Sequence, residues 1–330
     1  MSEILSGISM KKVVLSILLL LISIGSVFSQ FDVQLSQYMF HTSSYNPAAV
    51  GEGDLIHMTF QFRDQWLGFP NAGKTWLLSA NSPLKIGNSN NGIGLTFLHD
   101  QVGQFVNQSA HLQYAYKRKL GPGVLSVGAD LGFVNIGFNK GDSIQSPSHV
   151  IPIGDYHQIA DDPLIPTSSV TGFGFDMNVG VYYSTPTYYG GISYSHLNSP
   201  TVSWGDKWSF KEYGTLYLTG GYNLALADPK YVFKPSALIK SDLSSWQWEL
   251  TSRVEYDSKY WGGLSYRYQD AVVFLAGINI SGGLSVGCSY DLPTSQILSV
   301  SPGSLEFLAT YDLQYLFGKR TSKYKSIRIL

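Results

Sequence analysis

Residues 246–257 read WQWELTSRVEYD, and polar and apolar side chains alternate through them. One set of alternate positions is mostly apolar, and the other carries Glu249, Arg253, Glu255 and Asp257. Successive side chains of a β-strand point to opposite faces, whereas a helix would scatter these charges around its circumference. The stretch therefore predicts a strand with one dry face and one wet face. The wall of a transmembrane β-barrel has this property, because it contacts lipid outside and water inside.

The same period-two alternation recurs along most of the chain, clearly so at residues 173–183, 215–226, 284–292 and 305–317. It predicts an all-β fold, a single transmembrane antiparallel β-barrel of about 14 strands within residues 55–317. The expected strands are 55–65, 73–83, 91–100, 105–118, 123–138, 171–184, 187–197, 213–226, 231–240, 245–257, 259–269, 271–280, 283–292 and 304–317. Aromatic pairs near strand ends, such as Tyr182-Tyr183, Tyr188-Tyr189 and Tyr260-Trp261, are expected in the interfacial girdles.

The connections between the expected strands alternate in length. Every second connection is short and most are rich in turn-forming residues, whereas the three longest, Asn139–Val170, Asn198–Glu212 and Pro293–Gly303, all fall on the other end. Outer-membrane barrels have short periplasmic turns and long extracellular loops. The pattern therefore supports an even strand count and orients the barrel.

The N-terminus predicts export. Lys11 and Lys12 precede an apolar run at residues 13–24, and small residues follow up to Ser29. This is the organisation of a secretory signal peptide, which we assign to residues 1–29. No later stretch is long and apolar enough for a membrane-spanning helix. A membrane protein with this sequence would be a barrel, exported through the Sec pathway and inserted in the outer membrane.

Composition excludes several classes of function. Charged residues make up only 14% of the chain, aromatic residues also 14%, and the net charge is −1. The net charge gives no reason to expect nucleic-acid binding. With Cys288 as the only cysteine, an intrachain disulfide and a cysteine-based metal site are excluded. The seven histidines lack metal-ligand spacing, and no cofactor motif is present, so we expect neither metal nor cofactor.

The sequence favours a non-enzymatic protein. The pattern G-x-S-x-G occurs once, around Ser285, but polarity alternates straight through it, as in a strand, and no helix follows. A Ser-His-acid site assembled from separate strands, with His99-Asp100 or Ser195-His196, stays open as an alternative. The inward charges Glu249, Arg253, Glu255 and Arg267 are expected to form ion pairs in the lumen, a role in selectivity being the alternative.

Two segments flank the predicted barrel. Residues 30–54 lack alternation and are expected to form an N-terminal periplasmic segment at or in the periplasmic mouth. A lumen bounded by fourteen strands is too wide to be filled by wall side chains alone, so it is water-filled or plugged. The polar tail 318–330 is basic and is expected to hang in the periplasm.

Three motifs resemble the PorP/SprF family of type IX secretion membrane proteins. Gln37-Tyr38-Met39-Phe40 and the NPAxxG-like run with Asn46, Pro47 and Gly51 are similar to the family's opening. Arg63, Gln65, Trp66 and Gly68 match its R-x-Q-W-x-G element, and Gly303, Ser304 and Glu306 resemble its final GSHE-like hairpin, with Leu305 where histidine is common. Each motif alone is weak, but their order and spacing span residues 30–317. These motif residues can also have purely structural roles: a turn at Asn46-Pro47, a lumen ion pair for Arg63 and a girdle position for Trp66.

The resemblance implies a non-enzymatic outer-membrane component of the type IX secretion and gliding machinery. Some members act with a periplasmic ring lipoprotein and its partner (PorK and PorN), and others with a surface adhesin or cargo that carries a C-terminal sorting domain. Both branches fit these motifs. We expect cargo contact on the long extracellular loops, chiefly Asn139–Val170, and ring contact on the periplasmic turns, Phe31–Asp54 and the basic tail. The alternative is an outer-membrane porin or hydrophobic-solute transporter.

Overall fold

The computed structural model describes residues 32–87, 89–139, 168–205 and 208–313. The predicted signal peptide, most of the long loop 139–170, Phe317 and the basic tail 318–330 lie outside the described residues. Among the described residues, none of the helices is long and apolar enough to span a bilayer.

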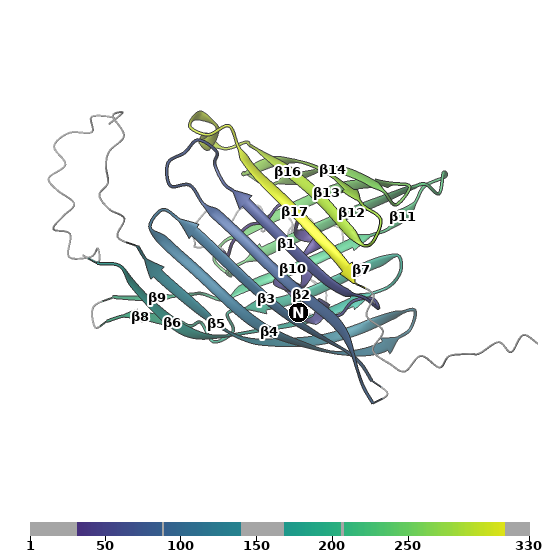
Figure 1. Ribbon diagram of the computed structural model, residues 1–330, viewed down its shortest axis with the longest axis horizontal. Helices are drawn as coiled ribbons and strands as arrows, with labels where there is room; N and C mark the ends of the chain where they lie inside the picture. Colours follow the sequence, from purple (N-terminus) through teal and green to yellow (C-terminus); the bar gives the residue numbers. More distant parts are fainter. Residues whose placement is uncertain (1–31, 88, 140–167, 206–207, 314–330) are drawn as a thin grey trace, which may run out of the picture.

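The described chain folds into one closed antiparallel barrel of 14 strands, as predicted. Each wall strand pairs with its neighbours along the chain, and β1 pairs with β17 to close the ring (Figure 1). The residues of β11 continue β10 after an interruption at Asn223, so the two form one wall strand. The wall strands are β1 (Ile56–Asp64), β2 (Lys74–Ile86), β3 (Ser89–Val102), β4 (Phe105–Leu120), β5 (Gly123–Phe138), β6 (Val170–Ser184), β7 (Tyr188–Ser195), β10 with β11 (Thr215–Tyr222, Leu224–Ala225), β12 (Tyr231–Ser241), β13 (Trp246–Tyr256), β14 (Tyr260–Arg267), β15 (Ala271–Asn279), β16 (Leu284–Pro293) and β17 (Ser304–Leu313).

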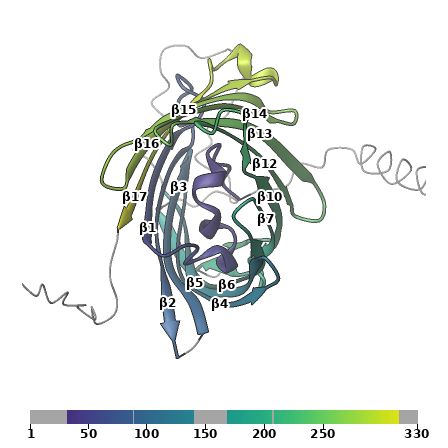
Figure 2. The same ribbon diagram turned by 90° about the vertical axis from the view of Figure 1, so that its right-hand side faces the viewer.

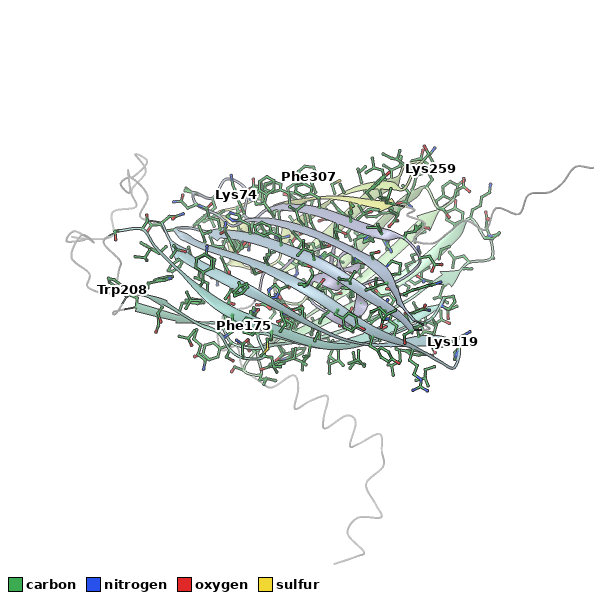
Figure 3. The ribbon with its side chains drawn as sticks, turned by 60° about the horizontal axis from the view of Figure 1, so that its bottom comes forward. Lys74, Lys119, Phe175, Trp208, Lys259 and Phe307 are labelled. Atoms are coloured by element: carbon green, nitrogen blue, oxygen red, sulfur yellow. The ribbon has the colours of Figure 1, made fainter. Side chains whose placement is uncertain are left out.

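The two ends of the barrel differ as the loop lengths predicted. The connections after β5, β7 and β16 are the longest, and all lie at one end, here called the outer end. The short turns and the start of β1 lie at the other, the inner end. Long loops are extracellular in outer-membrane barrels, so the outer end faces the cell exterior and the inner end the periplasm. In Figure 3, Lys74 and Trp208 lie at the outer end, and Lys119 and Lys259 at the inner end.

Alternation separates a lipid-facing surface from a polar lumen. Leu250 and Phe307 are 53% and 48% exposed on the outside, whereas Glu249 and Glu306, their neighbours in sequence, are 1% and 0% exposed. Figure 3 shows Phe175 and Phe307 on the outer surface of the wall. Burial of Glu249 and Glu306 inside the barrel requires partners in the lumen, because an unpaired buried charge is unfavourable by several kcal/mol.

The girdle prediction needs correction for one residue of each aromatic pair. Tyr188 and Tyr260 are exposed, as expected, but Trp261 is 4% exposed and faces the lumen. Tyr182 and Tyr189 also point inward and pack on each other near the inner end. The reason is the pleat itself: two consecutive residues cannot both face lipid, so each adjacent pair supplies one girdle residue and one lumen residue.

Residues 32–55, which we call the plug, run through the barrel: residues 32–51 lie inside it rather than in the periplasm, whereas Glu52, Gly53 and Asp54 are exposed at the inner end (Figure 2). The plug contains three short 3₁₀ helices, η1 (Tyr38–Phe40), η2 (Thr42–Ser44) and η3 (Pro47–Ala49). Its start, Asp32, contacts Lys240 at the outer end of β12, and its end leads into β1 at the inner end. The prediction put residues 30–54 at the periplasmic mouth, whereas most of the described part lies deeper, in the lumen. These residues contact the wall on all sides, which is why their sequence shows no alternation.

The connection between β7 and β10 is not part of the wall and forms a small hairpin, β8 (Thr201–Trp204) and β9 (Trp208–Lys211). A further 3₁₀ helix, η5 (Gln296–Ser299), lies in the connection between β16 and β17. Both elements belong to the outer end.

Deletion of residues 32–54 behind an intact signal peptide should open the lumen. In planar bilayers, the complete protein should show little conductance, and the deletion variant should form stable water-filled pores. Heat-modifiable migration in gels, a property of folded barrels, serves as the control for folding. Equal conductance of the two proteins would contradict occupation of the lumen by the plug.

Candidate functional site

A network of buried charges lies in the outer half of the lumen. Arg63 contacts Asp291 at 2.8 Å and Glu306 at 3.2 Å, and Arg267 contacts Glu249 at 2.8 Å and Asp291 at 3.1 Å. The five side chains come from five strands and are each at most 4% exposed. Arg63 and Glu306 lie directly opposite each other across the seam between β1 and β17. Shared contacts of this kind compensate the desolvation that burial imposes on each charge.

The plug completes this network with its backbone. The N–H groups of Ser36 and Gln37 each donate to one carboxylate oxygen of Glu306, both at 2.9 Å. The Ser36 hydroxyl donates to Asp291 at 2.7 Å and accepts from Arg63 at 2.9 Å. Charge-assisted hydrogen bonds are roughly twice as strong as neutral ones, so the network anchors the plug firmly. Gln37, Arg63 and Glu306 belong to the three family-like motifs, which therefore converge on one point.

The Asn46 motif anchors the middle of the plug to another part of the wall. The Asn46 side-chain oxygen accepts from the N–H of Ala48 at 3.0 Å, which caps η3, and Pro47 occupies the first helical position. The Asn46 amide nitrogen donates to the carbonyl oxygen of Val181 at 3.2 Å. A Cβ on Gly180 would lie 2.2 Å from the Asn46 oxygen, so the wall needs glycine where the plug approaches.

Gly51 ends the motif with φ of +65°, a conformation that side chains rarely adopt. Its N–H donates to the side chain of Asn81 on β2 at 3.0 Å. The turn interpretation of Asn46-Pro47 is therefore extended: the motif is a capped turn that docks on the wall.

The remaining motif positions fasten two outer loops together. The N–H of Trp66 donates to the Ser304 hydroxyl at 3.0 Å, and the N–H of Leu67 donates to the Gly303 carbonyl at 2.7 Å. The N–H of Gln65 donates to the Gly73 carbonyl at 2.8 Å within the β1–β2 loop. Trp66 thus lies in an outer loop. Left-handed φ angles occur at Trp66 (52°), Gly68 (78°) and Gly303 (148°).

The four predicted lumen charges differ in their partners. Glu249 and Arg267 pair within the network, and Glu255 pairs with Lys234 at 2.7 Å near the inner end. Arg253 instead lies over the Phe40 ring of the plug, with its guanidinium carbon 4.5 Å from the ring centroid. This cation–π contact replaces the ion pair expected from sequence, which contained no sign that a plug aromatic would reach Arg253.

A second cluster, not predicted as such from sequence, holds the start of the plug. His196, just beyond β7, contacts Asp32 at 3.1 Å, Asp176 at 2.9 Å and Glu212 at 3.3 Å. Burial alone would lower the pKa of His196, but Asp32, Asp176 and Glu212 together raise it well above its usual value. The imidazole is therefore protonated at neutral pH and ties the plug to β6 and to the connection between β9 and β10. Sequence gave no spacing signal, because Asp32 lies 164 positions before His196.

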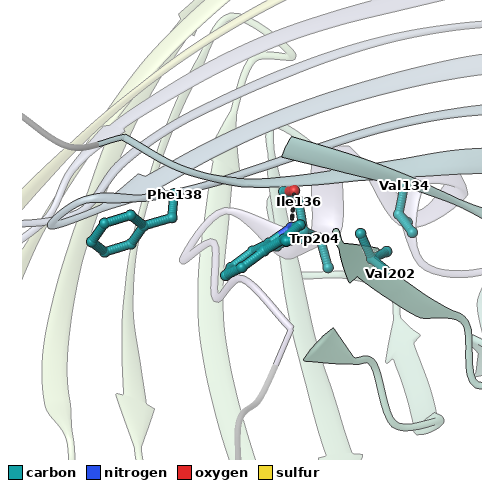
Figure 4. Close-up of a cluster of buried hydrophobic side chains, with 5 residues drawn as sticks. All are labelled: Val134, Ile136, Phe138, Val202 and Trp204. Carbon is teal, nitrogen blue, oxygen red and sulfur yellow. Dashed lines mark hydrogen bonds between the residues drawn. The ribbon is translucent and has the colours of Figure 1, made fainter. Parts of the chain in front are cut away.

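The β8–β9 hairpin folds over the outer part of the lumen. Val202 and Trp204 pack against the inward-facing Val134, Ile136 and Phe138 of β5 (Figure 4). The Trp204 indole N–H donates to the carbonyl oxygen of Ile136 at 2.8 Å (Figure 4). This apolar cluster holds the hairpin and the following residues, including Glu212, beside the plug.

A cavity of about 650 Å³ remains between the plug, this hairpin and the wall. Its floor includes the buried plug residues Tyr38, His41 and Tyr45, and its rim includes the exposed Val102 and Phe105 of the outer end. Among the described residues, no group of three or more His, Cys, Asp or Glu side chains could hold a metal ion. Ser285 lies inside β16, paired with Asn279 and Thr310, as the strand interpretation of the G-x-S-x-G pattern predicted.

A model of the type IX secretion system membrane protein family PorP/SprF matches residues 27–311. The chain belongs to the PorP/SprF family. It is therefore an outer-membrane component of the type IX secretion system. The residues that resembled family motifs in the sequence have three places in this PorP/SprF barrel. They lie in the charge network that holds the plug, in the capped turn at Asn46, and in the two outer loops joined through Trp66 and Ser304, which we call the clasp. Comparison with curated protein sequences finds no match.

Solved structures similar to this PorP/SprF protein include a channel, a transporter and a porin. The CymD monoaromatic hydrocarbon channel is 11% identical with a TM-score of 0.46, covering 88% of this chain and 96% of its own. The Pseudomonas putida toluene transporter TodX is 10% identical with a TM-score of 0.46, covering 86% and 95%. The KdgM porin is 10% identical with a TM-score of 0.37, covering 78% and 99%. Similarities this distant do not bear on function.

Replacement of Arg63 by methionine should destabilise the barrel by about 3–5 kcal/mol, because Asp291 and Glu306 lose their shared cation while they stay buried. Urea-induced unfolding in lipid bilayers measures the loss. Lys234→Met is the matched control: it removes one cation from a partly exposed pair, and should change stability by about 1 kcal/mol or less. Equal losses in the two variants would contradict the role assigned to the network.

Acid should release the start of the plug only well below neutral pH. Burial alone would raise the pKa of Asp32, but His196, Tyr217 and Lys240 lower it from 3.8 to about 2. A lowered carboxyl pKa stabilises the folded state above pH 3.8, and this contribution is lost as the pH falls toward 2. A spin label at position 33, in a C288S background, should stay immobile from pH 8 to pH 5 and become mobile below pH 3.8. Release between pH 8 and pH 5 would show that another group holds the segment.

Proposed function

We propose that this PorP/SprF protein supports export or surface attachment of type IX cargo through contacts at its two ends, and that its lumen is not the route of export. One observation carries the proposal: the plug extends from the outer half of the lumen to the inner end and is anchored along its length. Ser36 is held by the charge network, Asn46 by β6 and Gly51 by β2. A polypeptide passing through the lumen would have to displace all of these contacts.

The outer end has the properties of a surface that binds protein. Leu298 in η5 and Val300 just after it are 52% and 55% exposed, although they lie beyond the wall strands. Phe69 in the clasped β1–β2 loop is 43% exposed. Exposed apolar side chains outside the lipid-facing wall are typical of interaction sites, and the clasp holds these loops in one arrangement. We assign contact with a cargo or adhesin sorting domain to this end, together with the loop 139–170 predicted from sequence.

The inner end suits a periplasmic partner. Lys119 at the end of β4 and Lys230 and Lys259 in the turns are exposed cations at this end. β17 also ends here, and the basic tail 318–330 follows it in the sequence. A ring lipoprotein and its partner of the PorK/PorN kind would meet this surface.

A porin or hydrophobic-solute transporter is the second candidate, favoured by the apolar side chains that line the outer cavity. Transport would require a path past the plug to the inner end. Solute uptake by the complete protein in vesicles, at a rate matched by the plug-deletion variant, would support transport over the interaction role.

Two changes at the outer end should reduce surface cargo severalfold while the barrel still assembles. One is a short Gly-Ser linker in place of residues 140–167, and the other is Leu298→Asp combined with Val300→Asp, which places charge on the exposed apolar surface. Mass spectrometry of peptides released by protease from intact cells measures surface cargo. Ser299→Asp, a charge added to an exposed polar residue on the same turn, is the matched control and should have little effect.

Unchanged surface cargo in both altered strains would refute the assignment of the outer end. Affinity purification of the complete protein from native membranes tests the inner end separately. Recovery of a periplasmic lipoprotein, lost when the basic tail is removed, is the expected result.

A further inference from the structure

The outer cavity has an apolar wall and a group of acidic residues, Asp32, Asp100 and Glu212, which we call its acidic pole. Leu77, Leu98, Val134 and Ile136 face it from the inside of β2, β3 and β5, where a water-filled barrel would carry polar side chains. At about 650 Å³ it lies in the size range of sites that bind small organic ligands or a few peptide side chains. An apolar surface of this kind is stabilised when an apolar group displaces its water.

The charges at the pole do not balance. Asp32, Asp100 and Glu212 line the cavity, and among its described lining residues there is no lysine or arginine. His196 is the cation among the lining residues, and it also contacts Asp176, a buried residue on the lumen side of β6. Lys240 lies just beyond the lining, with its ammonium 2.9 Å from the Asp32 carbonyl oxygen. His196 and Lys240 together face four carboxylates, Asp32, Asp100, Asp176 and Glu212, so negative charge still exceeds positive charge at this end of the cavity and favours a cationic ligand group.

Glu212 is the residue best placed to receive that group. It is 11% exposed, and one carboxylate oxygen accepts from Asn107 at 2.7 Å. The other oxygen receives no hydrogen bond among the described residues, although it lies 3.3 Å from the His196 ring nitrogen. The protonated His196 compensates the charge of this oxygen, but the same ring nitrogen hydrogen-bonds Asp176 instead. A buried carboxylate oxygen without a donor is rare, and a ligand ammonium or guanidinium would supply the missing hydrogen bond.

The direction of access follows from the exposure of the lining. Tyr38, His41 and Tyr45 of the plug close the side toward the periplasm and are buried, whereas Val102, Phe105 and Tyr213 are exposed at the outer end. A ligand would enter and leave from the cell exterior, as in a binding site rather than a channel.

We propose that this cavity binds a basic residue flanked by apolar residues on an extracellular polypeptide, with the cationic group at Glu212 and the apolar side chains against β2, β3 and β5. This inference rests on the proposed function, because it supplies a site in the outer end for a segment of cargo. A free amphipathic amine has the same chemistry and is distinguished by the test.

The test uses the complete protein in lipid nanodiscs and a fluorescein-labelled pentapeptide with one lysine between leucine and phenylalanine. Fluorescence anisotropy should show saturable binding, and replacement of the peptide lysine by norleucine should weaken it by about tenfold or more. Glu212→Gln should weaken binding of the lysine peptide by a similar factor and leave the norleucine peptide unaffected. Ser109→Phe, which fills the cavity without a change in charge, should weaken both peptides.

Glu255→Gln is the matched control, since it removes a carboxylate near the inner end and should leave binding unchanged. Equal affinity for the two peptides, or equal effects of E212Q and E255Q, would overturn the proposal. Displacement of the peptide by phenethylamine at equal concentration would assign the cavity to free amines and overturn the polypeptide assignment.

Failure here is separable from failure of the proposed function. Loss of surface cargo in the outer-loop variants, without peptide binding by the purified protein, would sink the cavity proposal alone. Peptide binding that requires Glu212, in cells whose surface cargo is unchanged by the outer-loop variants, would support the cavity and refute the proposed function.

Discussion

The barrel closes where Arg63 of β1 meets Glu306 of β17 across the seam, and the plug is held by the same carboxylate. Glu306 uses both oxygens to accept consecutive plug N–H groups while Arg63 neutralises its charge. A fully buried carboxylate is tolerable only with such partners, because its desolvation would otherwise dominate. Closure of the wall and occupation of its lumen thus depend on one set of contacts, and each is incomplete without the other.

This dependence accounts for the positions of the family-like motifs. They lie in the plug, at the end of the first strand and at the start of the last strand, far apart in sequence. All three nevertheless meet at Glu306, which contacts Gln37 and Arg63. Pairing of β1 with β17 brings Arg63 opposite Glu306, and the flanking loops then fasten through Trp66 and Ser304. The motifs therefore serve the structure directly, and their functional effect passes through the shape of the outer end and the position of the plug.

Sequence predicted the wall well and the lumen poorly, for a physical reason. Period-two alternation is local, so stretches such as 246–257 were assigned correctly from their own residues, and loop parity oriented the barrel. The partners of inward residues depend on which chain fills the lumen, which alternation does not encode. Arg253 illustrates this: its ion pair was a reasonable expectation, but Phe40 from the plug lies against it. The His196 cluster, assembled from segments distant in sequence, carried no local signal at all.

The order of elements along the chain makes the plug part of assembly rather than a later addition. The plug precedes β1, and its anchor at Ser36 needs Arg63 from the first strand together with Asp291 and Glu306 from the last two. The anchor is therefore complete only when the last strand has paired with the first. By the same contacts, Glu306 can be buried in the lumen during barrel closure only when the plug N–H groups are there to donate to it. A binding partner that stabilises only one of two states shifts the balance toward that state. The plug, present in the same chain at high effective concentration, thus favours the closed barrel over the open sheet, and the protein that reaches the outer membrane has a filled lumen and two ends available for contact.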